Sequence, residues 1–419
     1  MATQSSCRNN LNLNININRK KHLEDKYNGD RKVTQLWLVL VISLCCLVPI
    51  HSYAVNEGSN DTSRLSRQAQ VLQSAKNMKN ALNSESNSNA NTMMSPRSTT
   101  ATTLRTYQLK TPVRDLKPPF PDGLNGGRLV TLPPSEHYNQ NSNPSGNSFI
   151  LPPRDIKVWV PAEYDKHPDM KFPVLYCHDG QNAVQDSTSW TGYSWRLAGA
   201  LTRLAERQLL QTNELCAPPI VVLMPCAEDN LAFVPRRHLE YGDISQTFAQ
   251  SHADFVGLTL KPLIDSKFRT MPEKEHTAVI GTSLGGQASL HLLLRHPDLF
   301  GKAACMSPAF QPSILTSVAT FSTSTLQDKT IYIDNGGDVD DVKVAFLDPF
   351  DHLSKEHWWN PGYWWLDSQL QPGIDAMMLA LDLKGIQYEY NKIAGGRHNE
   401  RAWALRIDKP LLALFGRTP

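Results

Sequence analysis

The sequence predicts an α/β fold, in which a mostly parallel central sheet is covered by helices on both faces. From about residue 105 onward, short apolar runs rich in β-branched residues alternate with amphipathic segments at helical spacing. Hydrophobic residues make up 40% and charged residues 20% of the 419 residues, which is an ordinary globular composition and excludes a wholly disordered chain. The net charge of +2 gives no electrostatic reason to expect nucleic-acid binding.

The expected elements follow one another in strand–helix order. The apolar runs predict strands over 155–161, 172–180, 218–226, 276–283, 329–337 and 387–393. The helical patterns cover 194–210, 252–268, 285–296 and 373–385. Seven cysteines are too few for a disulfide scaffold. Cys177, Cys226 and Cys305 fall in or beside apolar strands, so we expect buried, unpaired thiols there.

Before this α/β part lies a segment typical of a targeting signal. Residues 1–32 form a polar, basic, Asn-rich leader, and residues 33–50 form an apolar run without charge. Ser52-Tyr53-Ala54 then resembles a cleavage site, so 33–54 is either a signal peptide or an uncleaved signal-anchor. The basic flank would keep the N-terminal end cytoplasmic. We therefore expect a secretory-pathway protein, secreted or anchored in the membrane through 33–50, with its catalytic part lumenal or extracellular.

Residues 55–104 are predicted to be a disordered tether. They are rich in Asn, Ser and Thr and poor in aromatic residues, so they cannot bury enough surface to offset the entropy of ordering. Asn60 begins an N-x-[S/T] sequon. The remaining residues, 105–419, are expected to form one catalytic domain.

A candidate nucleophile lies at the end of the strand expected over 276–283. Gly281-Thr282-Ser283-Leu284-Gly285 matches G-x-S-x-G, with an apolar strand before it and a helix after it. Such a sharp strand-to-helix turn projects the serine hydroxyl, and the helix N-terminus faces developing negative charge. The motif in this context predicts that Ser283 is a nucleophile.

A serine nucleophile needs a base and an acid, and in folds with a G-x-S-x-G turn these follow it along the chain in the order acid, then histidine. His398 lies in a Gly-containing loop after the last expected strand, where such a base belongs. Asp338 and Asp340 directly follow the strand at 329–337, whereas Asp367 immediately precedes the next expected helix. From the residues alone, all three remain candidates for the acid.

The oxyanion hole requires two backbone N–H donors. One should belong to Leu284, the residue after the nucleophile, and the other to Gln181, in the loop after the strand at 172–180. Gly180 is expected to let the backbone turn so that the Gln181 amide faces the site.

Residues 338–366 look like an insertion rich in aromatic side chains. Four of the nine tryptophans, Trp358, Trp359, Trp364 and Trp365, lie within it and are candidates for stacking on a sugar ring or a phenolic group. The alternative is a loop that packs its own small core over the domain. His352, His357, Asp348 and Asp351 match no zinc or calcium spacing, so we predict no metal and no cofactor.

Residues 150–416 resemble the Putative esterase family of α/β-hydrolases, which includes enterochelin, feruloyl and acetylxylan esterases, S-formylglutathione hydrolase and mycolyltransferases. The resemblance is carried, in family order, by 154–161, 173–176, 178–182, Arg237, Glu240-Tyr241, 281–286, His398-Asn399-Glu400 and Trp403. It implies an α/β-hydrolase fold, with Ser283 as nucleophile and His398 as base. Leu366-Asp367, followed by Pro372, matches a family element in which Leu-Asp precedes a Pro-initiated helix, and this favours Asp367 as the acid.

The expected function is therefore a serine esterase that hydrolyses a small-molecule or glycan ester through an acyl-enzyme intermediate. An acyltransferase using the same triad is one alternative, and a non-catalytic carbohydrate-binding protein with a hydrolase-like fold is another. The oligomeric state is not fixed by the sequence.

Overall fold

A computed structural model describes residues 104–111, 113–137, 151–231, 233–337 and 366–417. All of these residues belong to one compact unit, residues 78–419. The leader, the apolar segment 33–54 and the tether up to residue 103 lie outside the described residues. Within the described ranges, no helix combines the length and the apolar character needed to cross a bilayer.

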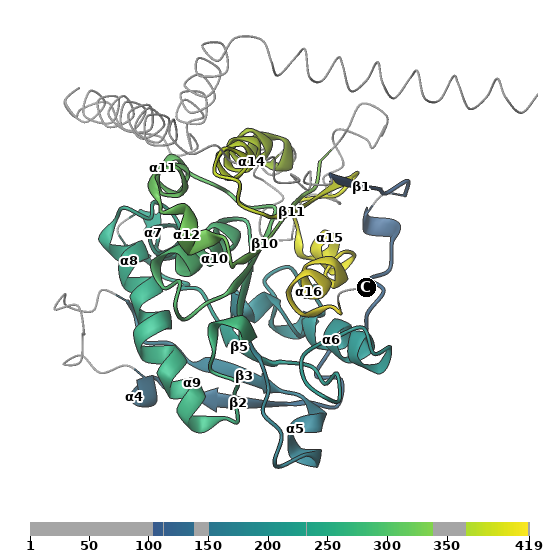
Figure 1. The fold of residues 1–419 in the computed structure, drawn as a ribbon. Helices are drawn as coiled ribbons and strands as arrows, with labels where there is room; N and C mark the ends of the chain where they lie inside the picture. Colours follow the sequence, from purple (N-terminus) through teal and green to yellow (C-terminus); the bar gives the residue numbers. More distant parts are fainter. Residues whose placement is uncertain (1–103, 112, 138–150, 232, 338–365, 418–419) are drawn as a thin grey trace, which may run out of the picture. The chain divides into compact units, whose positions relative to one another are not determined.

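A nine-stranded sheet forms the centre of the unit (Figure 1). Its strands, in spatial order, are β1 (Arg105–Gln108), β11 (Glu389–Ala394), β10 (Thr330–Asn335), β9 (Lys302–Met306), β8 (Thr277–Thr282), β4 (Val174–His178), β5 (Ile220–Met224), β3 (Ile156–Val160) and β2 (Arg128–Leu132). Neighbouring strands pair in parallel from β1 to β5, and β3 runs antiparallel to both β5 and β2. This order and direction confirm the predicted α/β-hydrolase fold.

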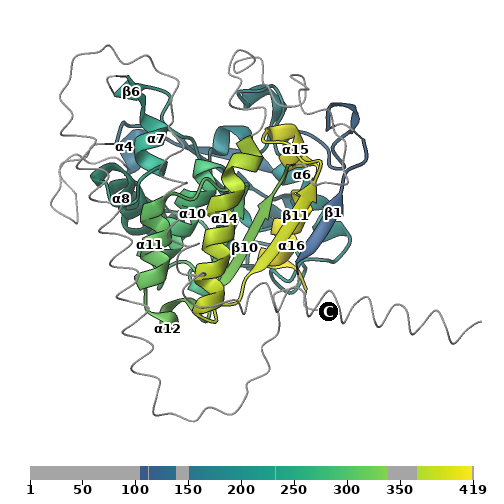
Figure 2. The same cartoon turned by 90° about the horizontal axis from the view of Figure 1, so that it is seen from above.

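Helices cover both faces of the sheet, as Figure 2 shows. On one face lie α6 (Leu197–Glu206) and α16 (Asp408–Phe415), which pack with the strands in the largest apolar cluster. On the other face lie α7 (Arg236–Tyr241), α8 (Thr247–Asp254), α10 (Leu284–Arg295), α11 (Pro312–Thr320) and α14 (Leu366–Leu383). Because the central strands are covered on both sides, every residue of β4, β5 and β8 is buried.

Shorter elements complete the unit. They are η1 (Val113–Asp115), α4 (Pro134–His137), α5 (Ala162–Lys166), η2 (Gly180–Asn182), η3 (Asp186–Thr188), β6 (Asn230–Leu231), β7 (Val234–Pro235), η4 (Phe255–Leu260), α9 (Lys261–Lys267), η5 (Lys274–His276), α12 (Thr323–Leu326) and α15 (Glu400–Ala404). Cys177, Cys216, Cys226 and Cys305 are buried and free, as expected for small hydrophobic side chains in this core.

The six strands expected from the apolar runs are all present. The helix expected at 194–210 is shorter, the one expected at 285–296 is shifted by a single residue, and the other two differ more. The pattern at 252–268 includes a π-helical turn, η4, between α8 and α9. The helix expected at 373–385 begins at Leu366 and contains Pro372, so Asp367 lies in its first turn rather than before it. Pro372 suggested a helix start because proline favours the first turn. The preceding turn is nevertheless helical, and the helix tolerates the backbone hydrogen bond that Pro372 cannot donate.

Candidate active site

The parallel strands bring three loops to one edge of the sheet. Ser283 follows β8, the loop of residues 179–182 (the Gln181 loop) follows β4, and the loop of residues 395–399 (the His398 loop) follows β11. Because these strands run in the same direction, their carboxyl ends meet at the same edge, where α/β sheets bind ligands.

Ser283 is held in a strained backbone conformation. Its φ is 56° and its ψ is −125°, outside the regions that non-glycine residues usually adopt. Its N–H donates to the Met306 carbonyl at 2.9 Å, and its carbonyl accepts from the Ala309 N–H at 3.0 Å. A Cβ on Gly281 would overlap the Gly285 carbonyl, so glycine is needed there for the turn to close. The strand, turn and helix predicted from the motif are therefore present around Ser283.

His398 and Asp367 form a buried hydrogen-bonded pair. Nδ1 of His398 lies 2.8 Å from Oδ1 of Asp367, and the two side chains are 4% and 5% exposed. Burial by itself would raise the pKa of Asp367, but the hydrogen bond and charge of His398, together with Arg406 and Lys392, lower it below its ordinary value. The carboxylate therefore stays ionised at neutral pH while it holds one ring nitrogen of His398.

The first turn of α14 is tied to the end of β10, which places Asp367. Nδ2 of Asn335 donates to the Asp367 carbonyl at 2.9 Å and to Oε1 of Gln371 at 2.7 Å. Nζ of Lys392 donates to the same Gln371 oxygen at 2.8 Å and to the Gly336 carbonyl at 2.7 Å. A Cβ on Gly336 would overlap Oδ2 of Asp367, so a glycine is required beside the carboxylate.

The imidazole of His398 packs against Trp403 of α15, and hydrogen bonds hold Trp403 and the residues after it in place. The ring of Trp403 meets it edge to face, with centroids 5.1 Å apart. Nε1 of Trp403 and Nη2 of Arg406 both donate to Oγ of Ser307, at 3.4 and 2.7 Å. Arg406 also forms a buried ion pair with Asp334 at 3.1 Å. These contacts fix the plane of the ring without using its Nε2 atom.

The predicted oxyanion donors, Gln181 and Leu284, meet at one small apolar cluster: Leu284 belongs to it, and Gln181 is bonded to its member Cys226. Oε1 of Gln181 accepts from the Cys226 N–H at 3.2 Å, and Cys226 packs in a cluster with Leu284, Tyr241 and Ala288. Since Leu284 is the first residue of α10, its N–H has no partner inside the helix. The side chain of Gln181 is thus occupied by Cys226, and the backbone N–H groups remain as the candidate donors.

The turn before Gln181 differs from the expectation. Asp179, not Gly180, adopts the left-handed conformation, with φ 53°. Gly180 is required for another reason, because a Cβ there would overlap the backbone of Leu223 in β5. Arg237 holds Asp179 in place through a two-pronged ion pair, with Nε and Nη2 at 2.8 and 2.7 Å from its carboxylate.

A partly exposed tryptophan, Trp190, borders the candidate site. Its ring packs against the cluster of Cys226 and Leu284, and the Arg237 guanidinium lies 5.8 Å from the ring centre. Its backbone N–H donates to Oδ1 of Asn182 at 3.2 Å. Trp190 was not predicted as a site residue because its sequence surroundings contain no motif.

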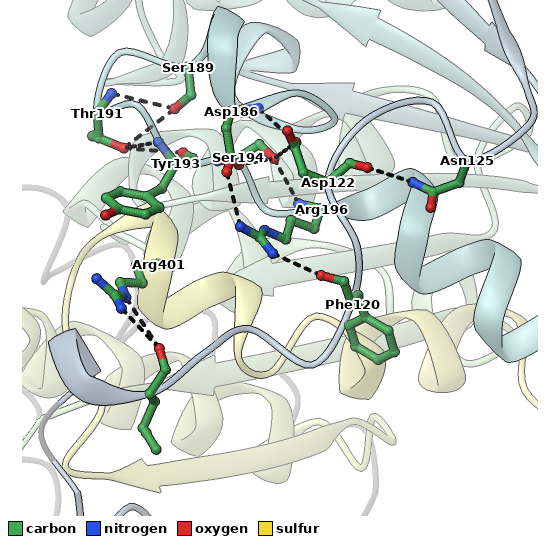
Figure 3. A network of polar contacts seen from close by, with 11 residues as sticks. Phe120, Asp122, Asn125, Asp186, Ser189, Thr191, Tyr193, Ser194, Arg196 and Arg401 are labelled. Atoms are coloured by element: carbon green, nitrogen blue, oxygen red, sulfur yellow. Dashed lines mark hydrogen bonds and ion pairs between the residues drawn. The ribbon is translucent and has the colours of Figure 1, made fainter.

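The loop that carries Trp190 is anchored by a polar network, shown in Figure 3. Asp186 accepts from Nη2 of Arg196 at 3.0 Å and from the Ser194 N–H at 2.7 Å. Its own N–H donates to Asp122 at 2.8 Å, which ties the loop to the segment before β2. The guanidinium of Arg401 stacks 5.0 Å from the ring centre of Tyr193 in the same loop. The loop is therefore attached both to the segment directly before β2 and to α15.

Several predicted residues lie outside the described part of the chain. They are the alternative acids Asp338 and Asp340, the tryptophans Trp358, Trp359, Trp364 and Trp365, and the residues considered for a metal, Asp348, Asp351, His352 and His357. Among the residues that are described, no group of His, Cys, Asp or Glu side chains is arranged to hold a metal ion.

The family is shown by a model that covers more than half of the chain. The family model described as Putative esterase matches residues 152–414. A curated endo-1,4-beta-xylanase/feruloyl esterase of Xylanibacter ruminicola is 26% identical over 147 residues, which cover 34% of this chain and 18% of that protein. The match therefore spans less than a fifth of the length of that relative.

The solved structures that are similar to this chain include two ferulic acid esterases and an enterobactin esterase. A ferulic acid esterase is 16% identical, with a TM-score of 0.45 over 68% of this chain and 98% of that chain. A ferulic acid esterase of Anaeromyces mucronatus in complex with ferulic acid is 16% identical, with a TM-score of 0.41 over 67% of this chain and 88% of that one. The enterobactin esterase of Shigella flexneri is 15% identical, with a TM-score of 0.44 over 71% of this chain and 62% of that one.

Proposed function

The chain belongs to the Putative esterase family, and we propose that it is a serine esterase using Ser283 as nucleophile, His398 as base and Asp367 as acid. The observation that carries the proposal is the buried 2.8 Å contact between His398 and Asp367, at the sheet edge where the strained turn presents Ser283. A histidine held at Nδ1 by an ionised carboxylate has its Nε2 available for proton transfer.

In the first half of the reaction, the ester is exchanged for an acyl-enzyme. Nε2 of His398 accepts the proton of the Ser283 hydroxyl as Oγ attacks the ester carbonyl carbon. The carbonyl oxygen becomes an oxyanion, which the N–H groups of Leu284 and Gln181 stabilise. The tetrahedral intermediate then breaks its C–O bond, and the alcohol leaves with the proton that His398 returns.

In the second half, water regenerates the enzyme. His398 takes a proton from the water molecule as its oxygen attacks the acyl carbon, and the same two N–H groups stabilise the second oxyanion. Ser283 leaves with that proton, and the carboxylic acid is released. Because the Asp367 carboxylate is ionised throughout, it stabilises the imidazolium ion that forms in each half.

The position of the Trp190 ring supports a role for this residue in substrate binding. Its partly exposed ring adjoins Leu284, one of the two proposed oxyanion donors, so it would contact a substrate group attached near the reacting carbonyl. A flat apolar surface at this place favours esters with an aromatic or bulky apolar group over simple acetates.

The proposed activity is tested with the full-length protein on a panel of p-nitrophenyl and aromatic carboxylic esters. We expect the wild type to release free acid, and Ser283→Ala to lose this turnover. Excess glycerol or sugar in the assay separates hydrolysis from acyl transfer, since a transferase would form a new ester in place of the acid. Turnover that persists undiminished in Ser283→Ala would contradict the proposal.

We further propose that the protein enters the secretory pathway through residues 33–54. The basic flank, the uncharged apolar run and the small-x-small site support this. Deletion of 33–54 should abolish translocation, so that Asn60 is no longer glycosylated. The measurement is the gel shift that follows enzymatic removal of the glycan, which the deletion variant should not show. A deletion variant that is still glycosylated would contradict this proposal.

A further inference from the structure

Glu400 is a buried carboxylate that the proposed mechanism does not use. It follows His398 by two residues, at the start of α15, and is 7% exposed. Its Oε1 lies 3.3 Å from Nδ2 of Asn182, which is 2% exposed and directly follows Gln181. The contact therefore joins the first residue of α15, which directly follows the His398 loop, to the Gln181 loop.

The orientation of the Asn182 amide is determined by its other contacts. Its Oδ1 accepts from the Trp190 N–H at 3.2 Å, so its Nδ2 must point the other way, toward Glu400. Its backbone is also fixed, since its N–H donates to the Asp179 carbonyl and its carbonyl accepts from the Trp195 N–H, both at 2.9 Å. A flipped amide would leave the Trp190 N–H without its acceptor and place two acceptors against each other at Glu400.

We propose that Glu400 is a positioning residue: through Asn182, its carboxylate fixes the spacing between the loop that carries His398 and the loop that carries Gln181. This inference rests on the proposed function, in which His398 moves the proton and the Gln181 N–H stabilises the oxyanion. A donor is effective only when it lies about 2.7–3.1 Å from the place where the oxyanion forms. A link that holds the two loops together therefore affects the rate more than the binding of substrate.

The surroundings of Glu400 also determine its charge. Burial raises the pKa of Glu400 to about 7; its own backbone N–H and a hydrogen bond from Thr191 oppose this rise, Asp179 adds to it and Arg237 opposes it. Asp179 lies in the Gln181 loop, and Arg237 lies in α7 and pairs with Asp179. The ionised carboxylate accepts the stronger, charge-assisted hydrogen bond from Asn182, so the link should weaken as the pH falls through about 7.

Four variants test the proposal in steady-state kinetics on one ester: Glu400→Ala, Glu400→Gln, Asn182→Ala and the double variant Glu400→Ala/Asn182→Ala. We expect Glu400→Ala to lower kcat about 10- to 100-fold, less than the roughly 10²–10³-fold loss of a whole oxyanion donor, with little change in KM. Glu400→Gln keeps a neutral acceptor for Asn182 but not the charge-assisted hydrogen bond, so its kcat should lie between that of Glu400→Ala and that of the wild type. The double variant should be no slower than the slower single one, since both remove the same link.

The pH profile of kcat separates positioning from a merely structural role. The wild type should show an ionisation near pH 7 that Glu400→Gln lacks, with activity rising as the group ionises. Glu206→Gln, a change at an exposed glutamate of α6 paired with Arg203, is the matched control and should leave the profile unchanged. If Glu400→Ala fails to fold, as judged by circular dichroism, Glu400→Gln and Asn182→Ala carry the test.

The proposal is overturned if Glu400→Ala keeps the wild-type kcat, if Glu400→Gln keeps the wild-type pH profile, or if the two single effects multiply in the double variant. A wild type that turns over no ester would instead contradict the proposed function. In that event, infrared difference spectra of the wild type against Glu400→Gln still report the carboxylate band of Glu400. A shift of that band in Asn182→Ala still reports the hydrogen bond between the two residues. If the Glu400 band were the same in the wild type and in Asn182→Ala, that result alone would overturn the positioning role.

Discussion

Nδ1 of His398 lies 2.8 Å from Oδ1 of Asp367, although 31 residues separate them in the chain. Strand pairing explains the proximity. β10 and β11 are parallel neighbours, with Asn335 opposite Lys392, and the backbones of Gly337 and Gly396 form a further bridge beyond the strand ends. Asn335 then holds the first turn of α14, so the proposed acid and the proposed base meet above two adjacent strands.

Replacement of Asp367 by Asn should remove most of the activity. The amide keeps the shape of the side chain but cannot stabilise the imidazolium ion, and it favours the wrong tautomer of His398. We expect kcat to fall by about 10³–10⁴-fold, with KM nearly unchanged, as for an asparagine at this place in a serine–histidine–aspartate triad. Steady-state kinetics on a short p-nitrophenyl ester provide the measurement.

The matched controls are Asp338→Asn and Asp340→Asn, which change the other carboxylates that the sequence offered as the acid. Both should keep activity within a fewfold of the wild type. Loss of activity in either control, with Asp367→Asn still active, would assign the acid to the segment after β10.

Gly336→Ala should impair both catalysis and stability. The added Cβ would overlap Oδ2 of Asp367 and press on the backbone of Gly396, so the carboxylate must move away from His398. We expect kcat to fall at least about tenfold and the melting temperature to fall by several degrees, as for other steric clashes in a core. Gly192→Ala is the control: its Cβ would meet nothing within 4 Å, and its φ of +75° adds only backbone strain. An active, stable Gly336→Ala would show that Asp367 does not need this close contact.

Local patterns predicted the elements around Ser283, since the strand, the turn glycines and the helix are contiguous in the sequence. Other elements left weaker signals. β1 and β2 lie at the edges of the sheet and are mostly exposed or half-buried, so they lack an apolar run. β9, with the sequence KAACM, is short and has small side chains, although four of its five residues are buried. Long apolar runs reveal central strands, whereas edge strands and small-residue strands are recognisable only in their tertiary context.

The partners of the site residues were less predictable than the residues themselves. Spacing alone left three aspartates as candidates for the acid, because the choice depends on the β10–β11 pairing and on Asn335. Trp190 borders the site through contacts with Arg237 and with the cluster of Cys226 and Leu284, which are distant in sequence. Glu400 drew attention only through its place beside His398 in the family resemblance, and its contact with Asn182 spans 218 positions. No local pattern encodes contacts of this kind.

Stability should decline in mild acid because buried histidines, His178, His252 and His291 among them, are kept neutral. Burial lowers the pKa of His178 to about 4 and of His291 to about 3, and it lowers the pKa of His252 well below the usual value. The unfolded chain therefore takes up these protons first, and the free energy of unfolding falls as the pH drops from about 6.5 toward 4. Each histidine contributes a slope of at most about 1.4 kcal/mol per pH unit in that window.

Urea unfolding at several pH values checks this expectation. His291→Leu removes one titrating group at similar volume and should flatten the decline, whereas His167→Gln, at an exposed position, should not. An unfolding free energy that stays constant between about pH 6.5 and 5 would contradict the role of the buried histidines.

Trp190→Ala should change substrate preference more than the chemical step. Loss of the ring removes an apolar contact beside Leu284. We expect KM for an aromatic ester to rise about tenfold, which corresponds to the roughly 1–2 kcal/mol of an aromatic contact, while kinetics on an acetate ester stay nearly unchanged. Trp190→Phe should recover most of the loss. Equal effects on both esters would place Trp190 outside the binding surface.

The most direct measurement of the central claim is covalent labelling of the nucleophile by a fluorophosphonate, with the modified residue located by mass spectrometry. We predict one adduct per chain, on Ser283, formed quickly in the wild type, slowly in Asp367→Asn and not at all in Ser283→Ala. Adducts on another serine, or undiminished labelling of Ser283→Ala, would contradict the assignment of Ser283, His398 and Asp367 as one catalytic unit.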